Sequence, residues 1–575
     1  MKGKKIFIIV LICIIVASVP VIYWIINLVS ERGGNGNGGY NHAPVINSYY
    51  PLKDPFIEES ETQKFNISAT DPDGDPLTYG WFLNGAEVGG NNSNYIFDAN
   101  SNPYGTYTVK VNVTDGDKVA DRSWTLSVQY IWSAEDCPGA PTDITLGQII
   151  KLGIIADTER FQGEGSWNGS YMAVEEINKA GGVHVDGETY YFGITSENTD
   201  EANPILNTVN AVAAANKLIN YKRVQYAVGG FRTECVIAYQ PLFCEKKIVF
   251  INTGVAADSL AQKVLDDYNS FKYFFHPSPQ NTSTLVTELI QLLIFTSLQL
   301  SQPKAAGGLG HNISRFSFMI EDLPWTALFA SAITEALESN EYWNMTYTGV
   351  SIAVPVNATF IQLEGYWDDI EDANTQIVIP IFSGATGQKF SISYGANQPH
   401  CLPYGINVIS QSSSHWDDTA GACNYSITME SVYDTNKTSK TRKFLYDYND
   451  KYSTDPIYTA TGSYDAVYSL AWAIEDADSF DPDDIVTALE SIQKSAPLMG
   501  AGGGTAYTPS HCNYYEWPIG IGLAIQWVNG SKHLIPGISV YPSDPWSTYF
   551  GIPPFGTLLN MTSIAIPYWG LYYFD

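Results

Sequence analysis

Basic residues are scarce in this chain. Its 575 residues include 30 lysines and arginines against 60 aspartates and glutamates, a formal net charge of -30 at pH 7. Proteins that bind nucleic acid neutralise phosphates with clustered lysine and arginine, so this balance argues against a nucleic-acid partner. Charged residues make up only 16% and hydrophobic residues 45%, which excludes a disordered polyanion. The chain is therefore a folded acidic protein, long enough for several domains.

Motifs of common enzymes are also absent. The sequence has no Gly-x4-Gly-Lys-Ser/Thr phosphate loop, no His-Glu-x-x-His zinc helix and no Gly-x-Ser-x-Gly nucleophile elbow. The dipeptides at His400 and His511, each followed by cysteine, would suit a metal. Disulfide-bonded cysteines beside incidental histidines are the favoured interpretation. We therefore predict a protein that is not an enzyme and needs no metal there.

One long apolar run lies near the N-terminus. Lys2, Lys4 and Lys5 precede 24 uncharged residues, 6–29, and a helix of that length would cross a bilayer core of ~30 Å. A cleaved signal usually has a shorter apolar stretch, so residues 1–30 are predicted to be a cytoplasmic lysine cluster and an uncleaved anchor. The lysines place the N-terminus in the cytoplasm. We expect a single-pass protein of the cell membrane with its bulk outside the cell.

Sequons and cysteines agree with an external location. Six cysteines follow the anchor, an even number that suits disulfides in an oxidising space, and Cys401 with Cys423 is the favoured pair. Cys235 and Cys244 would lie at opposite ends of one helix, too far apart to bond. Asn-x-Ser/Thr sequons predict a glycoprotein; they occur at Asn66, Asn91, Asn112, Asn168, Asn281, Asn312, Asn344, Asn357, Asn424, Asn436, Asn529 and Asn560.

The segment after the anchor changes character twice. Residues 31–43 are rich in glycine and asparagine and predict a flexible linker. Residues 44–130 contain short runs of alternating apolar residues separated by turn residues, which is typical of a small β-sandwich. The stretch 69–85, Ala-Thr-Asp-Pro-Asp-Gly-Asp-Pro-Leu-Thr-Tyr-Gly-Trp-Phe-Leu-Asn-Gly, resembles the polycystic-kidney-disease (PKD) and related Ig-like extracellular modules.

Three aspartates in this module, Asp71, Asp73 and Asp75, have two interpretations. They would offer carboxylate oxygens to calcium. The favoured alternative is a turn in which Gly74 takes a positive φ and the aspartates accept nearby backbone N–H groups, because the distal glutamate of a complete calcium loop is missing. We therefore predict no cofactor, with calcium at these aspartates as the minor alternative.

Residues 148–545, which follow a linker at 131–147, alternate between buried strands and helices. The run 148–156 is almost continuously apolar, as expected of a strand buried on both faces of a parallel sheet. Strands are predicted at 190–195, 224–228 and 247–251, with helices at 202–220 and 234–245. A second series has strands at 316–320, 346–352, 376–382 and 405–409. The fold class is thus α/β, with two doubly wound lobes and a cleft between them. The tail 546–575 is rich in tyrosine and proline and receives no assignment.

Five stretches in this region carry a family resemblance. Residues 150–156, 168–183, 226–234, 239–254 and 461–475 resemble, in order, the type I solute-binding proteins of the leucine/isoleucine/valine-binding branch. That resemblance implies capture of a small molecule, an amino acid or similarly small polar solute, between two hinged lobes. It also implies an ABC permease in the membrane as partner. The alternative is a ligand-sensing or adhesive surface glycoprotein that uses the same fold without transport.

Ligand contacts are expected in the loops that follow the strands. Arg232, Thr233 and Glu234 open a helix, where backbone amides and the helix dipole form a seat for an anion. The resemblance implies Ser or Thr at this point, which Thr233 supplies. Arg232 would bind a carboxylate or else form a surface salt bridge. The predicted ligand-binding set is Arg232, Thr233, Glu234, Asn252, Thr253, Asp157, Phe382, Ser383, Gln411 and Trp416.

Several members of this set have an ordinary structural alternative. Asn252 and Thr253 would form a second wall of the cleft or a plain turn. Phe382 and Trp416 would pack a ring-bearing ligand, although aromatic residues more often belong to the core. Lone carboxylates at strand ends, Glu321, Asp322 and Asp417, would meet an ammonium group or cap helices.

Overall fold

The computed structural model describes residues 40–301, 310–311, 313–339, 345–515, 519–520, 522–535, 564–567 and 569. The predicted anchor, most of the 31–43 linker and most of the 546–575 tail lie outside the described residues. The chain divides into two units, one ending at Gln129 and one beginning at Tyr130. Within the described residues, no helix combines the length and the apolar character needed to span a bilayer.

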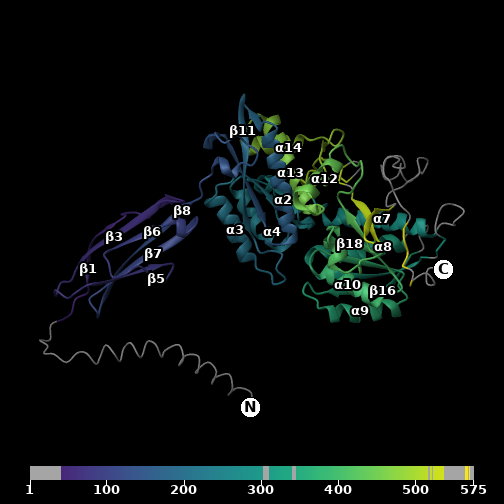
Figure 1. Ribbon diagram of the computed structural model, residues 1–575, viewed down its shortest axis with the longest axis horizontal. Helices are drawn as coiled ribbons and strands as arrows, with labels where there is room; N and C mark the ends of the chain where they lie inside the picture. The colour runs from purple at the N-terminus through teal and green to yellow at the C-terminus, as the bar shows by residue number, and fades with distance from the viewer. Residues whose placement is uncertain are drawn as a thin grey trace, which may run out of the picture. The chain divides into compact units, whose positions relative to one another are not determined.

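The first unit is a sandwich of two β-sheets (Figure 1). Apolar side chains alternate inward along its strands, so that Val109, Val111 and Val113 are all buried. Trp81 and Trp124 stack with ring centroids 6.1 Å apart inside this core. One sheet has the order β1 (Val45–Tyr50), β3 (Thr62–Thr70), β6 (Asn94–Asp98); the other is β2 (Phe56–Glu58), β8 (Val119–Gln129), β7 (Gly105–Thr114), β4 (Thr78–Leu83), β5 (Ala86–Val88).

The three aspartates of this unit lie in a turn. One oxygen of Asp71 accepts the N–H groups of Asp73 at 2.8 Å and Asp75 at 3.2 Å. Gly74 adopts a φ of +84°, which favours glycine. Asp73 also accepts the N–H of His42 at 2.6 Å. These carboxylates stabilise the turn, and the described part of the chain holds no group of three or more His, Cys, Asp or Glu side chains placed to hold a metal.

The first lobe of the second unit is built on a six-stranded sheet. Its order is β10 (Val183–Val185), β11 (Glu188–Asn198), β9 (Ile149–Ala156), β12 (Tyr226–Gly229), β13 (Val249–Asn252), β14 (Phe274–Phe275), parallel except for β10. Its helices are α2 (Phe161–Lys179), α3 (Thr208–Asn220), α4 (Thr233–Glu245), α5 (Asp258–Asp266), α6 (Tyr268–Phe271), α12 (Thr441–Tyr452), α13 (Tyr458–Ala477) and α14 (Pro482–Ser491). Late in the chain, α13 returns to pack beside α2 (Figure 1).

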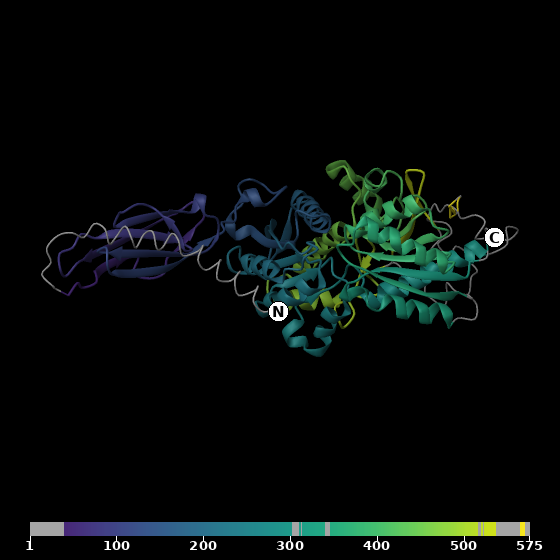
Figure 2. The same ribbon diagram turned by 90° about the horizontal axis from the view of Figure 1, so that it is seen from below.

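The second lobe repeats this architecture on a seven-stranded sheet with helices on both faces (Figure 2). Its order is β16 (Thr346–Val354), β15 (Arg315–Glu321), β17 (Ile377–Phe382), β18 (Leu402–Asn407), β19 (Ile427–Glu430), β22 (Leu523–Val528), β23 (Ser531–Leu534). The last two strands are antiparallel to their neighbours. Its helices are α7 (Thr282–Ser301), α8 (Phe329–Glu338), α9 (Phe360–Asp372), α10 (Thr386–Asn397) and α11 (His415–Asp418).

The two lobes share a topology that positions a binding site. In the first lobe, the first strand β9 lies between β11 and β12. In the second lobe, the first strand β15 lies between β16 and β17. In each lobe the successive connections therefore run in opposite directions from the first strand. In open α/β sheets, ligands bind at the carboxyl ends of the strands beside this reversal. The expected crevices therefore follow β9 and β12 in the first lobe and β15 and β17 in the second. The predicted α/β fold class with two doubly wound lobes is confirmed.

One predicted helix begins later than expected. Helix 202–220 starts only at Thr208, where Asn207 caps the N–H of Val209 at 3.1 Å. Residues before it, including Pro204, form an irregular loop. That loop brings Glu201 to the carboxyl edge of the sheet.

The predicted disulfides are absent. All six cysteines that the structure describes are free and buried. Cys401 packs among apolar side chains of the second lobe instead of pairing with Cys423. Cys235 and Cys244 lie at opposite ends of α4, as expected.

Sequon asparagines differ in accessibility. Asn91, Asn357, Asn436 and Asn529 are exposed. Asn168, inside α2, is only 9% exposed and has no room for a glycan in the folded chain. Asn312, Asn344 and Asn560 lie outside the described residues. Glycosylation at the exposed positions stays a prediction.

Candidate functional site

A cavity of about 420 Å³ lies between the two lobes of the second unit. Its walls come from the loops after the strands of both sheets, from α13 and from the segments by which the chain crosses between lobes. Small-molecule sites typically have volumes of roughly 300–1,000 Å³, so the cavity is large enough for a small solute. The two lobes therefore form the walls of this cavity.

On the first lobe, the amide at the start of α4 binds a side chain of the protein. Glu201, 1% exposed, accepts the N–H of Arg232 at 3.0 Å and the hydroxyl of Thr199 at 3.0 Å. Burial raises the pKa of Glu201 to about 7 although these donors oppose the shift. The anion seat predicted at this helix is thus partly filled by Glu201.

On the second lobe, Glu321 ends β15 and Ser383 follows the neighbouring strand β17. One carboxylate oxygen of Glu321 accepts the N–H of Ser383 at 2.9 Å and its hydroxyl at 2.5 Å. The other oxygen, Oε1, has no hydrogen-bond partner among the described residues, and Glu321 is 0% exposed. Burial raises the pKa of Glu321, while the charge of Arg232 opposes the shift. This carboxylate lines the cavity with one acceptor open.

A second group of charges lies where the chain crosses between lobes. Glu288 on α7 accepts the N–H of Gly522, and both oxygens of Asp465 on α13 accept backbone N–H groups, from Ala501 at 2.6 Å and Gly502 at 2.9 Å. Burial raises the pKa of Glu288 to about 7 and that of Asp465 to about 6. The buried Lys437 offsets part of both negative charges, and burial lowers its own pKa to about 8.

Glu430, at the end of β19, is neutralised by a lysine. Lys532 Nζ lies 3.0 Å from Glu430 and 3.1 Å from Asp455, and it also donates to the carbonyl of Gln411. Burial raises the pKa of Glu430 to about 7, and the nearby Lys532 charge opposes this shift. Glu430 lines the cavity, but it is already part of a buried ion pair.

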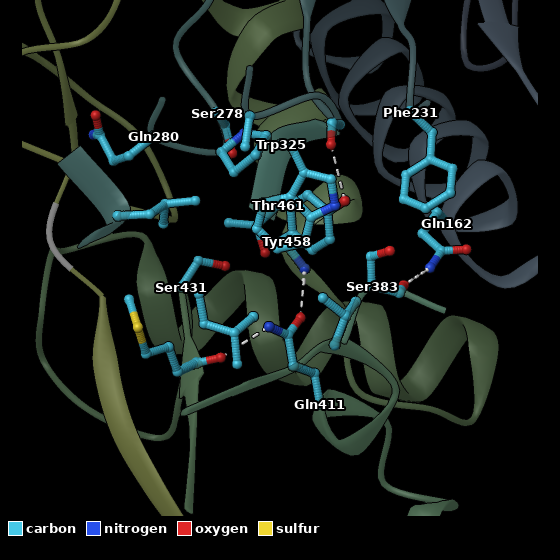
Figure 3. Close-up of a pocket in the computed structure, with 18 of the residues that line it drawn as sticks. Gln162, Phe231, Ser278, Gln280, Trp325, Ser383, Gln411, Ser431, Tyr458 and Thr461 are labelled. Carbon is cyan, nitrogen blue, oxygen red and sulfur yellow. Dashed lines mark hydrogen bonds between the residues drawn. The ribbon is translucent and has the colours of Figure 1, made fainter. Parts of the chain in front are cut away.

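Aromatic side chains from both lobes also line the cavity. They are Phe161 and Phe231 of the first lobe, Trp325 of the second, and Tyr458 at the start of α13. In Figure 3, Trp325 and Tyr458 lie close together, with Phe231 and Gln162 on one side and Gln280 and Ser431 on the other. Phe161 and Trp325 each pack against the cores of both lobes.

Direct hydrogen bonds join the lobes around this space (Figure 3). Gln162 of α2 donates to the carbonyl of Ser383 in the second lobe. Gln411 of the second lobe accepts the N–H of Tyr458 at 3.0 Å, and the Tyr458 hydroxyl donates to the carbonyl of Gly254 at 3.0 Å. The two walls are therefore within side-chain reach of each other.

Half of the predicted ligand-binding residues lie in the cavity wall: Arg232, Thr233, Glu234, Ser383 and Gln411. Arg232 takes the alternative foreseen for it. Its guanidinium donates to Glu234 at 3.4 Å and to the carbonyl of Asn203 at 3.0 Å. Whether these five residues bind a ligand stays a prediction.

The other five predicted residues lie outside the cavity wall and have structural partners. Asp157 is buried and accepts the N–H of Ala202. Asn252 closes a turn onto Val255, and Thr253 shares a hydrogen bond of 2.7 Å with Ser463. Two are aromatic: Phe382 packs against Phe390 in the core, and Trp416 stacks on Trp527.

Sequence reasoning missed several residues of the wall. Glu201 precedes its amide partner by about thirty positions and stood next to a segment predicted to be helical. Glu288 and Asp465 lie inside long helices, where no turn signal marks them. Gln162 and Tyr458 begin helices α2 and α13, at the same edge as the strand ends. A rule that also examines the first turn of every helix would have found these two.

The fold and cavity define a class: two-lobed α/β binding proteins that enclose a small molecule between their lobes. The sequence family described as periplasmic binding protein matches residues 150–513, and the PKD domain matches residues 41–130. The chain therefore belongs to the periplasmic binding protein family and carries a PKD domain before the binding lobes. A comparison with curated proteins finds no match.

Solved structures with the same fold are solute-binding proteins of ABC transporters. LivJ, a branched-chain amino acid transporter substrate-binding protein of Streptococcus pneumoniae in complex with isoleucine, has a TM-score of 0.52 at 15% identity over 67% of this chain and 99% of its own. A solute-binding protein of R. palustris with benzoate has 0.52 at 14% over 67% and 95%. A leucine-binding protein, LivK of Thermotoga maritima, has 0.53 at 14% over 67% and 97%.

Proposed function

We propose that this chain is the extracytoplasmic solute-binding component of an ABC importer, tethered to the cell membrane by its N-terminus. It captures an amino acid or similarly small polar solute between its two lobes. The observation that carries this proposal is the 420 Å³ cavity at the carboxyl ends of both sheets, with buried charged groups from each lobe. Structures of the same fold, reported with isoleucine and with benzoate, support it.

Hinge closure is the mechanism that this arrangement favours. Gln162, Ser383, Gln411 and Tyr458 already exchange hydrogen bonds between the lobes. A solute that touches both walls adds contacts only when the lobes are together. Its binding free energy therefore shifts the equilibrium between open and closed forms, and an importer would read the closed form.

Thermal-shift measurements on the purified full-length chain test the proposal. The panel contains amino acids, amines, aromatic acids, sugars and amides. We expect at least one solute to raise the melting temperature, because a ligand that binds only the folded state stabilises it. No shift with any member would contradict the proposal.

A blocked cavity provides the matched control. Ala385 is exposed at the rim and lines the cavity, so Ala385→Trp places a ring in the cleft without disturbing the core. Ser331→Trp adds the same ring on the exposed face of α8. The first variant should lose the shift and the second should keep it.

A further inference from the structure

The ionisable side chains around the cavity are mostly acidic. Two arginines contribute positive charge to the wall, Arg160 and Arg232. Six carboxylates oppose them, three from each lobe or its crossing segments: Glu201, Glu234, Glu288, Glu321, Glu430 and Asp465. The wall therefore attracts positive charge, unless each carboxylate is already satisfied by the protein.

Part of the place where a solute's carboxylate would bind is already taken. A carboxylate is stabilised by backbone N–H groups at a helix N-terminus. At the residue that precedes α4, the N–H of Arg232 donates to Glu201, which also accepts from Thr199. Glu201 thus uses, as part of the chain, a donor that the sequence offered to an anionic ligand.

Two of the cations near the cavity are engaged as well. The guanidinium of Arg232 donates to Glu234 and to the carbonyl of Asn203. Lys532 contacts Glu430 and Asp455 in a buried ion pair. Arg160, the other arginine of the wall, is exposed at the N-terminal end of α2. At Arg232 and Lys532, a carboxylate entering the cavity would have to compete with these protein partners.

Glu321 is fully buried, yet its Oε1 has no hydrogen-bond partner among the described residues. Glu430 Oε1 also lacks a hydrogen bond there, but it forms an ion pair with Lys532 Nζ at 3.0 Å. Ser383 donates twice to the other oxygen of Glu321, which fixes that carboxylate in place. Burying an acceptor that lacks a donor costs free energy. A ligand N–H would remove that cost, so Oε1 of Glu321 marks where a donor belongs.

Two further features of the wall suit an organic cation. The buried Gln280 also lines the cavity with its side-chain oxygen unpartnered among the described residues, a second acceptor for a ligand N–H. The rings of Phe231, Trp325 and Tyr458 supply π-faces, which attract ammonium groups as well as apolar chains.

We infer that the cavity takes a solute with a protonated amine and no free carboxylate, and that Glu321 binds its ammonium group. This inference rests on the proposed solute-binding function and narrows its substrate class. It differs from the amino-acid expectation in one respect: Glu201 provides the carboxylate that an amino acid would otherwise bring.

Two pairs of solutes test the inference: the first pair differs only in the carboxylate, and the second exchanges the ammonium group for a carboxylate. Isothermal titration of the full-length chain at pH 7 compares 3-methylbutylamine with leucine and benzylamine with benzoate, with 1,4-diaminobutane as a fifth probe. We expect each monoamine to bind at least tenfold more tightly than its carboxylate-bearing partner. Leucine or benzoate binding as tightly as its amine would overturn the inference and leave the solute-binding function intact.

Glu321→Gln sharpens the test, because it removes the charge and keeps the shape. We expect at least a tenfold loss of amine affinity, whereas Glu335→Gln on the exposed face of α8 should leave affinity unchanged. The thermal midpoints of both variants establish that they are folded, and the wild-type solute pairs need no variant at all. Unchanged amine affinity in folded Glu321→Gln would contradict the role of Glu321. Absence of binding by all five probes and by the wider panel would count against both proposals.

Discussion

Glu201 in the first lobe and Glu321 in the second are carboxylates of equal burial with opposite hydrogen bonding. Both follow or end strands at the edge that faces the cavity. Glu201 accepts two donors from its own lobe, one on each oxygen. Glu321 accepts from one residue on one oxygen and leaves the other open. The difference separates a carboxylate that completes the fold from one that is available to a ligand.

Glu430 is a third case, in which a cation satisfies the carboxylate. The side chain of its partner Lys532 is 7% exposed and also lies 3.1 Å from Asp455. Burial alone therefore does not identify a ligand-binding carboxylate. What distinguishes Glu321 is the acceptor that the protein itself does not use.

Removing Lys532, the cation that pairs with Glu430, should have the largest effect on the free energy of unfolding. Lys532→Met leaves Glu430 buried without its partner, and breaking a buried pair costs about 3–5 kcal/mol. Urea unfolding of the full-length chain measures this loss. Lys246→Met, at an exposed position of the first lobe, should change the free energy of unfolding by less than about 0.5 kcal/mol. A loss below about 1 kcal/mol for Lys532→Met would show that Glu430 does not depend on the pair.

Truncating Glu201, whose two oxygens both accept hydrogen bonds within the protein, should have the next largest effect on the free energy of unfolding. Glu201→Ala leaves the N–H of Arg232 and the Thr199 hydroxyl without their acceptor. We expect a loss of about 2–3 kcal/mol. Glu321→Gln should change stability by at most about 1 kcal/mol, because Ser383 keeps an acceptor oxygen. Equal losses in the two variants would remove the distinction between these carboxylates.

A smaller effect is expected from pH. Burial raises the pKa of Glu201, Glu288 and Glu430 to about 7, so each binds its proton more tightly in the folded chain than in the unfolded one. Stability is therefore lost as pH rises through the folded pKa values. Between pH 6.5 and 7.5 the three groups together should cost on the order of 2 kcal/mol.

Two histidines oppose part of this change. Burial lowers the pKa of His276 and His415 to about 4. Because an unfolded histidine is still about half protonated at pH 6.5, the two together should add roughly 0.7 kcal/mol of stability between pH 6.5 and 7.5, which leaves a net loss of about 1.3 kcal/mol. Urea unfolding at pH 6.5 and 7.5 measures this loss, and Glu201→Ala should reduce it by about half. Stability that rises across this interval would contradict the assigned burial of these carboxylates.

Much of the fold followed from the sequence, because strands buried on both faces are nearly continuous apolar runs. The run that became β9 and the loops after β12 and β17 were placed correctly, and with them Arg232 and Ser383. The contacts that each side chain makes could not be predicted. Nothing in the sequence around Glu201 shows that its carboxylate accepts the N–H of Arg232 at the start of α4.

Other misses have the same origin. Asp157, Asn252 and Thr253 do follow strands, but their side chains turn back into local hydrogen bonds. The even cysteine count suggested disulfides, and the polar, loop-like stretch around Cys401 and Cys423 favoured that pair, whereas the free Cys401 is held by apolar packing. Local pattern thus predicts which loops reach the cavity, and three-dimensional contacts decide which atoms remain available there.

The most direct test of the central claim measures the distance between the lobes. Spin labels at Lys217→Cys in α3 of the first lobe and Ser331→Cys in α8 of the second report that distance by pulsed electron resonance. The six native cysteines that the structure describes are buried, and Cys13 is replaced by serine in the labelled chain. With a solute that stabilises the chain, we predict a shorter and narrower distance distribution, and no change in the Ala385→Trp background. A distribution that stays the same with a bound solute would contradict capture by closure of two lobes.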